Sequence, residues 1–248
     1  MARLRTVSVA VPRYRARFSR DARDITAAQG LRALAFATQG PDSDGFDDLC
    51  THLLIEDTDG VLVCCARLLL LADGADVASS YSAQFYDLTA LAGFCGGMAE
   101  VGRFCIHPGR ADGDILRVAW AAVTGFVDRH KIEMLFGCSS FSGVESDAYL
   151  ETFAMLKARH IAPARWLPRI KAPEVIPYAF GKSRVPDLKL ALKAMPPLLR
   201  TYLMMGGWVS DHAVVDRGMN TLHVFTGLEI RAIPENRKRL LRQIALDI

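Results

Sequence analysis

The sequence has no apolar run long enough to cross a membrane. Its two strongest runs, residues 61–65 and 68–72, fall far short of the roughly 20 residues that a membrane-spanning helix needs, and Arg67 interrupts the segment between them. The arginines near the N-terminus are not followed by an uninterrupted apolar stretch, so we expect no cleaved signal peptide. We therefore expect a cytoplasmic protein.

Signatures of metal binding and of nucleophilic catalysis are also missing. The six cysteines include no CxxC pair and lie mostly in apolar runs, as small core residues of a reducing compartment do. The six histidines include no HExxH or other ligand spacing, so we expect no metal site. Cys138, Ser139 and Ser140 form a run that lacks a GxSxG context, and Cys138 has no evident histidine partner in sequence.

The charge is balanced overall but unevenly distributed. With 51% hydrophobic and 23% charged residues, the 248-residue chain is typical of a folded protein, and its net charge of +3 is too small to indicate nucleic-acid binding. Arginines are concentrated in residues 3–23 and basic residues in 231–242, whereas acids are concentrated in 42–59. The basic ends are either a solvated rim or a docking surface for an acidic partner or anionic lipid heads.

The hydrophobic pattern predicts an α/β protein with a mixed central sheet flanked by helices. We expect helices at 21–38, 112–131, 146–160, 187–194 and 197–205, and strands at 52–56, 61–71, 99–106, 132–138, 208–216 and 221–230. A helical crossover makes the strands at 99–106 and 132–138 parallel, which leaves a ligand crevice at their carboxyl ends. We expect a single domain, 1–248, with a basic arm at 1–20, a basic irregular and helical insertion at 162–207 and a terminal strand pair at 208–230.

One acid and one arginine stand out in the strand at 99–106. A carboxylate in a mostly apolar strand is unfavourable unless it is paired, so Glu100 and Arg103 need an explanation. On a regular strand the two side chains face opposite ways, but a bulge at Gly102 would bring them together. They then form either a catalytic pair or a purely structural buried ion pair, which contributes little stability.

This strand, in this order of elements, resembles the GNAT acyltransferase superfamily. It is more similar to the acyl-carrier-protein-dependent branch, which contains acyl-homoserine-lactone synthases and ornithine N-acyltransferases. The motifs shared with both are Arg32 with Phe36, Asp44 with Asp47, His52-Leu-Leu, Arg67-Leu-Leu and Glu100 with Arg103. The segments at 136–141, 195–202 and 213–216 are similar to the ornithine acyltransferases only. The resemblance implies a GNAT fold with extra C-terminal helices.

The resemblance also implies a reaction. A 3-hydroxyacyl thioester on the phosphopantetheine of acyl carrier protein is attacked by the α-amine of an amino acid, which gives a lyso-aminolipid. Ornithine is the expected acceptor and glutamine the alternative, with no permanently bound cofactor, and the protein would contact the inner membrane peripherally. The rival hypotheses are an acetyl-coenzyme A acetyltransferase, an acyl-homoserine-lactone synthase and a non-catalytic module that binds carrier protein or a lipid surface.

The loop before the helix at 112–131 departs from the superfamily's phosphate loop. It keeps the basic Arg110 and the first glycine, Gly113, but Ile115 replaces the last small residue. Asp112 and Asp114 oppose phosphate binding, so we expect weak coenzyme A binding and a carrier held partly by protein contacts. Arg110 and Arg117, near the helix start, could hold the phosphopantetheine phosphate, or could simply be solvated.

Roles for the remaining candidates follow from this reaction. Glu100 is the candidate general base, directly or through a water, with Arg103 beside it. Tyr149 could protonate the departing thiolate, with core packing as the alternative. The residues expected to bind the carrier arm, which would lie as an extra strand between the parallel strands, are Phe104, Ile106, Arg110, Gly113 and Arg117.

The expected substrate-binding residues are Arg32, Phe36, Asp44, Asp47, Arg67, Ser139 and Ser140. The charged members, with Arg103, could form an ionic network below the acyl site. Alternatively, Asp44 and Asp47 bind the cationic amino acid or belong to a solvated acidic loop. An apolar stripe is either core or a lid over the acyl chain, and consists of Leu198, Leu199, Tyr202 and Met205.

Overall fold

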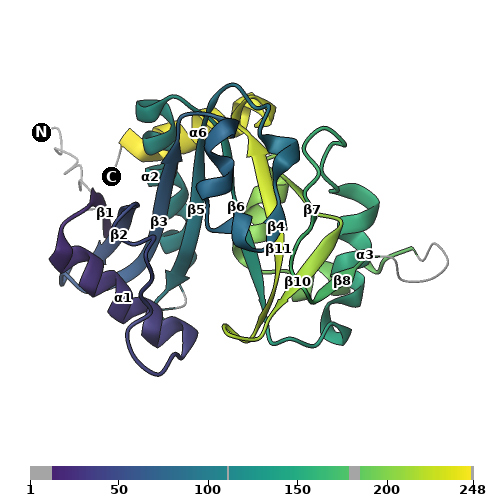
Figure 1. Ribbon diagram of the computed structural model, residues 1–248. Helices are drawn as coiled ribbons and strands as arrows, with labels where there is room; N and C mark the ends of the chain where they lie inside the picture. The colour runs from purple at the N-terminus through teal and green to yellow at the C-terminus, as the bar shows by residue number, and fades with distance from the viewer. Residues whose placement is uncertain (1–12, 111, 179–184, 247–248) are drawn as a thin grey trace, which may run out of the picture.

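Two parallel strands, β5 (Gly97–Ile106) and β6 (Ile132–Ser142), lie at the centre of a mixed sheet. The computed structural model describes residues 13–110, 112–178 and 185–246, and in these residues nine strands form the sheet. Their order is β1-β2-β3-β5-β6-β11-β10-β8, from left to right in Figure 1, and β9 also pairs with β11. All the other strand pairings in this sheet are antiparallel.

The remaining elements surround these two strands. The other strands of the sheet are β1 (Tyr14–Ser19), β2 (Thr51–Asp57), β3 (Leu62–Leu71), β8 (Val175–Pro177), β9 (Trp208–Val209), β10 (His212–Asp216) and β11 (Thr221–Glu229). A separate ribbon pairs β4 (Tyr86–Asp87) with β7 (Arg169–Ile170). The helices are α1 (Ala22–Phe36), α2 (Gly113–His130), α3 (Leu150–Arg159), α4 (Leu188–Ala194), α5 (Pro197–Met204) and α6 (Glu235–Leu246). No helix within the described ranges is both long and apolar enough to span a membrane.

Helix α2 is the crossover that makes β5 and β6 parallel. Its N-terminus is capped by Asp112, whose side chain accepts a hydrogen bond from the backbone N–H of Asp114 at 2.9 Å. Its C-terminus ends at Lys131, which adopts a left-handed conformation after two basic residues that complement the helix dipole. This confirms the helix predicted at 112–131 and the predicted parallel pairing of the two strands that it connects.

Different helices cover the two faces of the sheet. On one face, Leu68 and Leu135 pack with α2 in a cluster that Leu241 of α6 joins, while α3, α4 and α5 cover the half around β10 and β11. On the other face, Cys65 packs against Leu31 of α1, and the segment between β3 and β5 covers the rest. Figure 1 shows α2 and α6 close together on one side of the sheet.

Most of the elements expected from periodicity are present, with four corrections. The strand predicted at 208–216 is divided into β9 and β10, each of which pairs with β11. The described part of the predicted arm contains the edge strand β1, which pairs with β2 and carries the exposed Arg15 and the partly buried Arg17. The irregular segment before α4 contains β7 and β8, and a helix, α6, follows β11. Residues 1–12 of the arm lie outside the described residues.

Strands as short as β7 and β8 produce no clear alternation. The alternation of Tyr14, Ala16 and Phe18 with arginines does indicate β1, but these residues lie among the basic residues of the predicted arm.

The two central strands separate directly after Glu100 and Phe136. Their pairing extends from Gly97 to Glu100 on β5, and beyond that point each strand continues without the other. At the separation, Gly137 lies so close to the Val101 carbonyl that a Cβ added to this glycine would be 2.3 Å from that oxygen. The parallel strands therefore form an opening, as the sequence predicted for this end of the sheet.

We expect Gly137→Ala to destabilise the protein because its methyl group would overlap the Val101 carbonyl. Urea unfolding should show a loss of about 2 kcal/mol in the free energy of unfolding. Gly125→Ala is the matched control, since nothing lies within 4 Å of a Cβ at this position within α2. It should stabilise the protein by about 0.5–1 kcal/mol. Equal stability of the two variants would contradict the close approach at Gly137.

Candidate functional site

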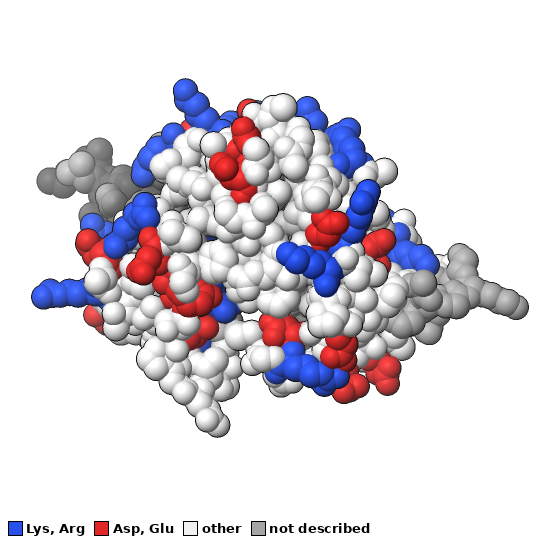
Figure 2. Space-filling view, in the orientation of Figure 1, with Lys and Arg blue, Asp and Glu red and all other residues white. Residues whose placement is uncertain are grey.

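A cavity of about 540 Å³ lies between the separated ends of β5 and β6, a volume typical of small-molecule sites. The end of α1, the turn between β10 and β11 and the start of α5 complete its wall. Figure 2 shows a notch in the surface at the lower edge of the molecule, where the separated ends of the two strands lie. The predicted site residues that line the cavity are Phe36, Arg67, Glu100, Arg103, Phe104, Ile106, Ser139 and Ser140.

Glu100 lies in the cavity wall and is held by hydrogen bonds from the segment before β4. Its Oε2 accepts from the backbone N–H of Tyr81 at 2.8 Å, and its Oε1 accepts from the N–H and Oγ–H of Ser82 at 2.7 and 2.5 Å. Only 4% of Glu100 is exposed. Burial raises the pKa of Glu100 above its ordinary value of 4.5, although these hydrogen bonds and the charge of Arg67 oppose the shift. Such a carboxylate is suited to accept a proton.

Arg103 also lines the cavity, but it does not form an ion pair with Glu100. The bulge is one residue beyond the predicted Gly102: Arg103 has a φ of 49°, and Arg103 and Phe104 together oppose a single residue of β3. The guanidinium bonds Asp42 at 2.9 Å and Asp44 at 3.4 Å instead. The expected Glu100–Arg103 pair is therefore wrong, because each charge has its own partners.

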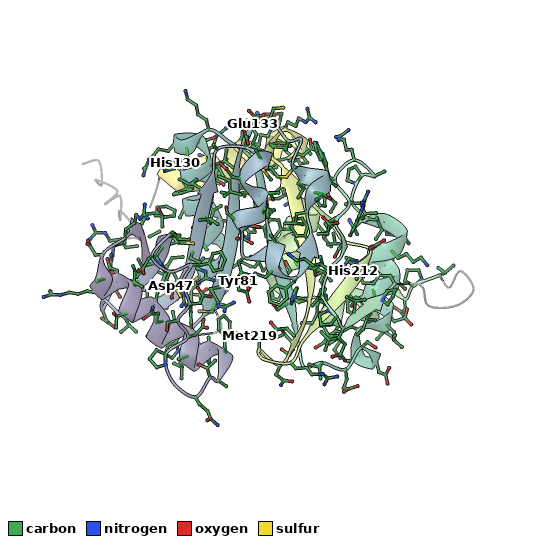
Figure 3. The ribbon with its side chains drawn as sticks, in the orientation of Figure 1. Asp47, Tyr81, His130, Glu133, His212 and Met219 are labelled. Carbon is green, nitrogen blue, oxygen red and sulfur yellow. The ribbon has the colours of Figure 1, made fainter. Side chains whose placement is uncertain are left out.

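Tyr81 connects these two groups. Its ring lies 4.9 Å from the Arg103 guanidinium carbon, while its backbone N–H donates to Glu100. Figure 3 shows Tyr81 near the centre of the molecule, to the right of Asp47 and above Met219. Tyr81 and Ser82 were not predicted, because they lie in a small-residue-rich segment that carries no catalytic motif.

Below the cavity, three arginines and three aspartates form one ionic network. Arg32 bonds Asp47 through two parallel hydrogen bonds of 2.7 and 2.8 Å. The further contacts are Arg67 to Asp44 at 2.5 and 2.8 Å, Arg67 to Asp47 at 2.9 Å, Arg32 Nε to Asp42 at 2.9 Å, and the two Arg103 pairs given above. The sequence indicated every member of this network except Asp42, which lies two residues before the motif formed by Asp44 and Asp47.

The aspartates of the network are engaged by the protein itself. Asp47 is 2% exposed, and its oxygens accept from Arg32, Arg67 and Gln29. Burial alone would raise the pKa of Asp47, but the hydrogen bonds from Arg32 and Gln29 and the Arg32 charge outweigh it, so the pKa lies below its ordinary value. A solvated acidic loop is thus not what the structure contains, and Asp47 has little capacity left for a cationic substrate.

The two serines after Cys138 point to opposite faces of the sheet. Ser139 is buried, and its hydroxyl accepts a hydrogen bond from Thr226 at 3.0 Å. Ser140 alternates with it along β6 and shares a face with Cys138. Burial raises the pKa of the Cys138 thiol to about 12, and its close neighbour is the Ser82 hydroxyl at 3.4 Å. Cys138 is therefore a neutral thiol, as the absence of a nucleophile motif indicated.

Tyr149 does not reach the cavity. Its ring packs 4.9 Å from the ring of Phe141, and its hydroxyl donates to the Ser142 carbonyl at 2.7 Å. The structure thus brings Tyr149 to the edge of the core, the alternative that the sequence left open, and not to the lining of the cavity. In the predicted lid stripe, Leu199, Tyr202 and Met205 are buried core residues, whereas Leu198 lines the cavity together with Pro196 and Pro197.

The expected phosphate-binding residues lie outside the cavity lining and have carboxylate partners. Arg110 bonds Asp57 at 2.8 Å, and Arg117 lies 3.3 Å from Asp114. Gly113 begins α2, where the side chain of Asp112 caps the helix and also accepts from Tyr14 at 2.8 Å. The arginine side chains are about half exposed, so each pair contributes little stability and can be exchanged for a phosphate at low energetic cost.

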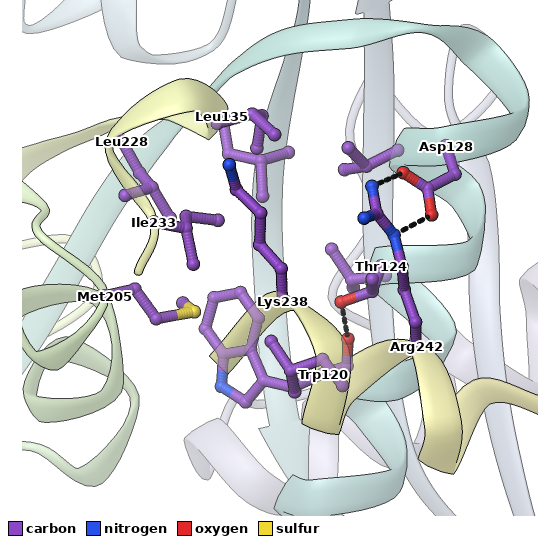
Figure 4. A pocket seen from close by; sticks show the side chains of 13 residues that line it. Trp120, Thr124, Asp128, Leu135, Met205, Leu228, Ile233, Lys238 and Arg242 are labelled. Carbon is purple, nitrogen blue, oxygen red and sulfur yellow. Dashed lines mark hydrogen bonds and ion pairs between the residues drawn. The ribbon is translucent and has the colours of Figure 1, made fainter. Parts of the chain in front are cut away.

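A second cavity, between α2 and α6, is too small for a substrate. Its volume of about 30 Å³ is enough for only one or two water molecules. In Figure 4 Arg242 bonds Asp128 beside it, and Lys238 extends over an apolar wall that includes Trp120 and Ile233. This cavity is a packing gap between helices.

Another cavity, of about 520 Å³, is lined by residues that include Trp166, Glu229 and Arg231, and none of the predicted site residues lines it. The 540 Å³ cavity that contains Glu100 and Arg103 is therefore the candidate site.

Comparison with known proteins places the chain among acyltransferases. A family model described as an acetyltransferase (GNAT) domain matches residues 27–121. The chain is 34% identical over 244 residues to an L-ornithine N(alpha)-acyltransferase of Rhodobacter capsulatus, covering 91% of this chain and 93% of that protein. It is 31% identical to one of Brucella abortus, covering 84% and 82%.

A solved structure has the same fold. FeeM, an N-acyl amino acid synthase from uncultured soil microbes, superposes with a TM-score of 0.51, covering 89% of this chain and 94% of that chain at 14% identity. The sheet and its flanking helices are therefore of the GNAT type, as the sequence motifs predicted.

We expect Asp47→Asn to destabilise the protein because Arg32 and Arg67 would remain buried with too little negative charge. Urea unfolding at neutral pH should show a loss of about 3 kcal/mol. Since the pKa of Asp47 is lowered in the folded state, its contribution is present above the ordinary value of 3.8 and is lost as pH falls below it. The difference between the two proteins should therefore shrink in acid.

The control is Asp48→Asn, because the Asp48 side chain is exposed. It should change the free energy of unfolding by less than about 0.5 kcal/mol. A loss in Asp47→Asn no larger than that of the control would rule out a stabilising role for the network.

Proposed function

Since this chain belongs to the L-ornithine N(alpha)-acyltransferase family, as its motifs indicated, we propose that it transfers a 3-hydroxyacyl group from acyl carrier protein to the α-amine of ornithine. The product is an N-acylated amino acid, a lyso-aminolipid. The names of its relatives support ornithine as the acceptor, and glutamine remains the alternative. The observation that carries the proposal is the buried carboxylate of Glu100 in the wall of the large cavity, where the parallel strands separate.

Glu100 acts as the general base. An amine is largely protonated at neutral pH, and it must lose its proton before or during attack on the thioester carbon. The ammonium first releases one proton to water. As the neutral amine forms the new N–C bond, Glu100 accepts a second proton from nitrogen, the C–S bond breaks and the thiolate leaves with the electron pair. The proton then on Glu100 is available to the thiolate, so no separate tyrosine acid is required. Arg103, with Tyr81 stacked on it, can offer N–H donors to the acceptor's carboxylate.

The opening between β5 and β6 suits the carrier's phosphopantetheine arm. Beyond Glu100 the facing edges of the two strands are not paired with each other, so their backbone groups can bond the amides of an extended arm. Phe104 and Ile106 form one side of this opening, and Leu116 and Leu198 extend its apolar surface for the acyl chain. Arg110 and Arg117 would take the phosphate by giving up their exposed carboxylate partners.

The basic C-terminal helix suits contact with the inner membrane, where a lyso-aminolipid is needed. In α6 the basic residues Arg237, Arg239 and Arg242 lie near Leu240, of which 59% is exposed. Basic side chains beside an exposed leucine favour an anionic lipid surface. We include this peripheral contact in the proposal, together with a cytoplasmic location.

The purified protein tests the reaction directly. We expect 3-hydroxyacyl carrier protein and ornithine to yield an N-acylated product by mass spectrometry, with acyl-coenzyme A a much poorer donor. Preferred use of acetyl-coenzyme A would identify an acetyltransferase instead, and use of S-adenosylmethionine as the acceptor would identify a homoserine-lactone synthase. Tight binding of carrier protein with no product for any acceptor would support a non-catalytic module.

Glu100→Gln should lower kcat by about 100-fold, because the glutamine cannot accept a proton. The activity of the unchanged protein should fall as pH drops through the raised pKa of Glu100, and this acid limb should be absent from the residual activity of the variant. Glu133→Gln is the control, since Glu133 is exposed on β6 at the far end of the sheet (Figure 3). Full activity of Glu100→Gln across this pH range would exclude Glu100 as the base.

A further inference from the structure

The far wall of the cavity carries an acid and a histidine that the reaction above does not use. Asp216 ends β10, His223 lies on β11, and both line the cavity. The strand register places them on the same face of the sheet as Glu100. Glu100 of β5 pairs with Phe136 of β6. Four residues further along β6, Ser140 pairs with His223 of β11. His223 also pairs with Val214 of β10, which is two residues before Asp216. Residues paired in this way point to one side, so these side chains face a common space.

Asp216 has no ion-pair partner among the described residues. Its Oδ1 accepts a hydrogen bond from the backbone N–H of Met219 at 3.0 Å, and this bond closes the turn between β10 and β11. The adjacent Arg217 points elsewhere and bonds Glu174 at 2.8 and 2.5 Å. The negative charge of Asp216 reaches into the cavity: burial chiefly raises the pKa of Tyr81, and Asp216 adds to that rise.

His223 lines the same cavity, and its buried Nε2 is an acceptor that is unpaired within the described residues. Only 3% of this residue is exposed. The Tyr86 hydroxyl donates its proton to the His223 carbonyl at 2.9 Å, so its oxygen can only accept from Nδ1, which lies 3.2 Å away. This arrangement puts the imidazole proton on Nδ1. Burial lowers the pKa of His223 to about 4, so the ring is neutral, and Nε2 keeps a lone pair with no partner in the described part of the chain.

A carboxylate and a neutral nitrogen acceptor together match an alkylammonium ion, which carries positive charge and three N–H donors. An anion or a carboxylate would be repelled by Asp216, and a neutral amide would leave its charge unpaired. The arginines on the opposite wall cannot supply the missing charge, since Asp42 and Asp44 already pair with Arg103, and Asp44 also pairs with Arg67.

We propose that Asp216 and His223 bind the terminal ammonium of the acceptor's side chain, which selects a diamino acid and presents its α-amine to Glu100. This inference rests on the proposed function and decides between its two acceptors, because glutamine has no side-chain cation. It also accounts for acylation at the α-nitrogen, since the other amine is held at the opposite wall.

The test compares ornithine with norvaline, which has the same carbon chain but no terminal amine. With 3-hydroxyacyl carrier protein as the donor, kcat/KM of the unchanged protein should favour ornithine strongly. Asp216→Asn should reduce this ornithine-to-norvaline ratio on the order of 100-fold, because the neutral amide no longer pairs with the ammonium. Asparagine keeps the oxygen that Met219 requires, so the turn should remain intact. His223→Phe should reduce the ratio in the same direction.

Asp211→Asn is the matched control, because Asp211 precedes β10 with an exposed side chain outside the cavity lining. Its ratio should equal that of the unchanged protein. An unchanged ratio in Asp216→Asn would overturn this inference while the acylation of ornithine still stood. If the unchanged protein acylates neither amino acid, the proposed function itself fails. Because the readout is a ratio within one protein sample, partial misfolding of a variant does not imitate the expected result.

Discussion

The contact between Gly137 and the Val101 carbonyl determines where the two parallel strands part. Up to Glu100 and Phe136, β5 and β6 are hydrogen-bonded, and beyond them each strand pairs only with its antiparallel neighbour. The separation opens the cavity, exposes unpaired backbone edges and leaves Glu100 at the boundary between closed sheet and open space. A side chain at Gly137 would push this boundary apart. The proposed acyl transfer depends on this single close approach.

Charges around the cavity are balanced in two different ways. Arg32, Arg67 and Arg103 are neutralised by aspartates of one loop, so the positive wall is fixed in place without a strong net charge. Glu100 has no such counter-ion and accepts hydrogen bonds from backbone and hydroxyl donors instead. These neutral donors lower the pKa of a carboxyl group less than a paired arginine does. This difference explains how a buried carboxylate next to arginines can keep a raised pKa.

The cavity therefore distinguishes its ligands by position. Its apolar side, built by β5, α2 and the start of α5, suits an acyl chain and an extended carrier arm. Its polar side places a base at the strand separation and an unpaired acid on the β10–β11 hairpin. The two amines of a diamino acid complement these two carboxylates. The fold is shared with other acyltransferases, whereas our proposal assigns the choice of acceptor to these side chains.

The order of elements, the parallel crossover and the family could be predicted from the sequence, because periodicity, caps and motifs depend on residues close together in the chain. The arginine–aspartate network was also largely predictable, through Arg32, Asp44, Asp47 and Arg67. Only the tertiary structure decided that Glu100 is held by Ser82, 18 residues away, and that Arg103 pairs with Asp42, 61 residues away. It likewise separated Tyr149 from the cavity and brought Asp216 to it. Hydrogen-bond partners of buried charges come from distant segments, and no local pattern specifies which of them will meet.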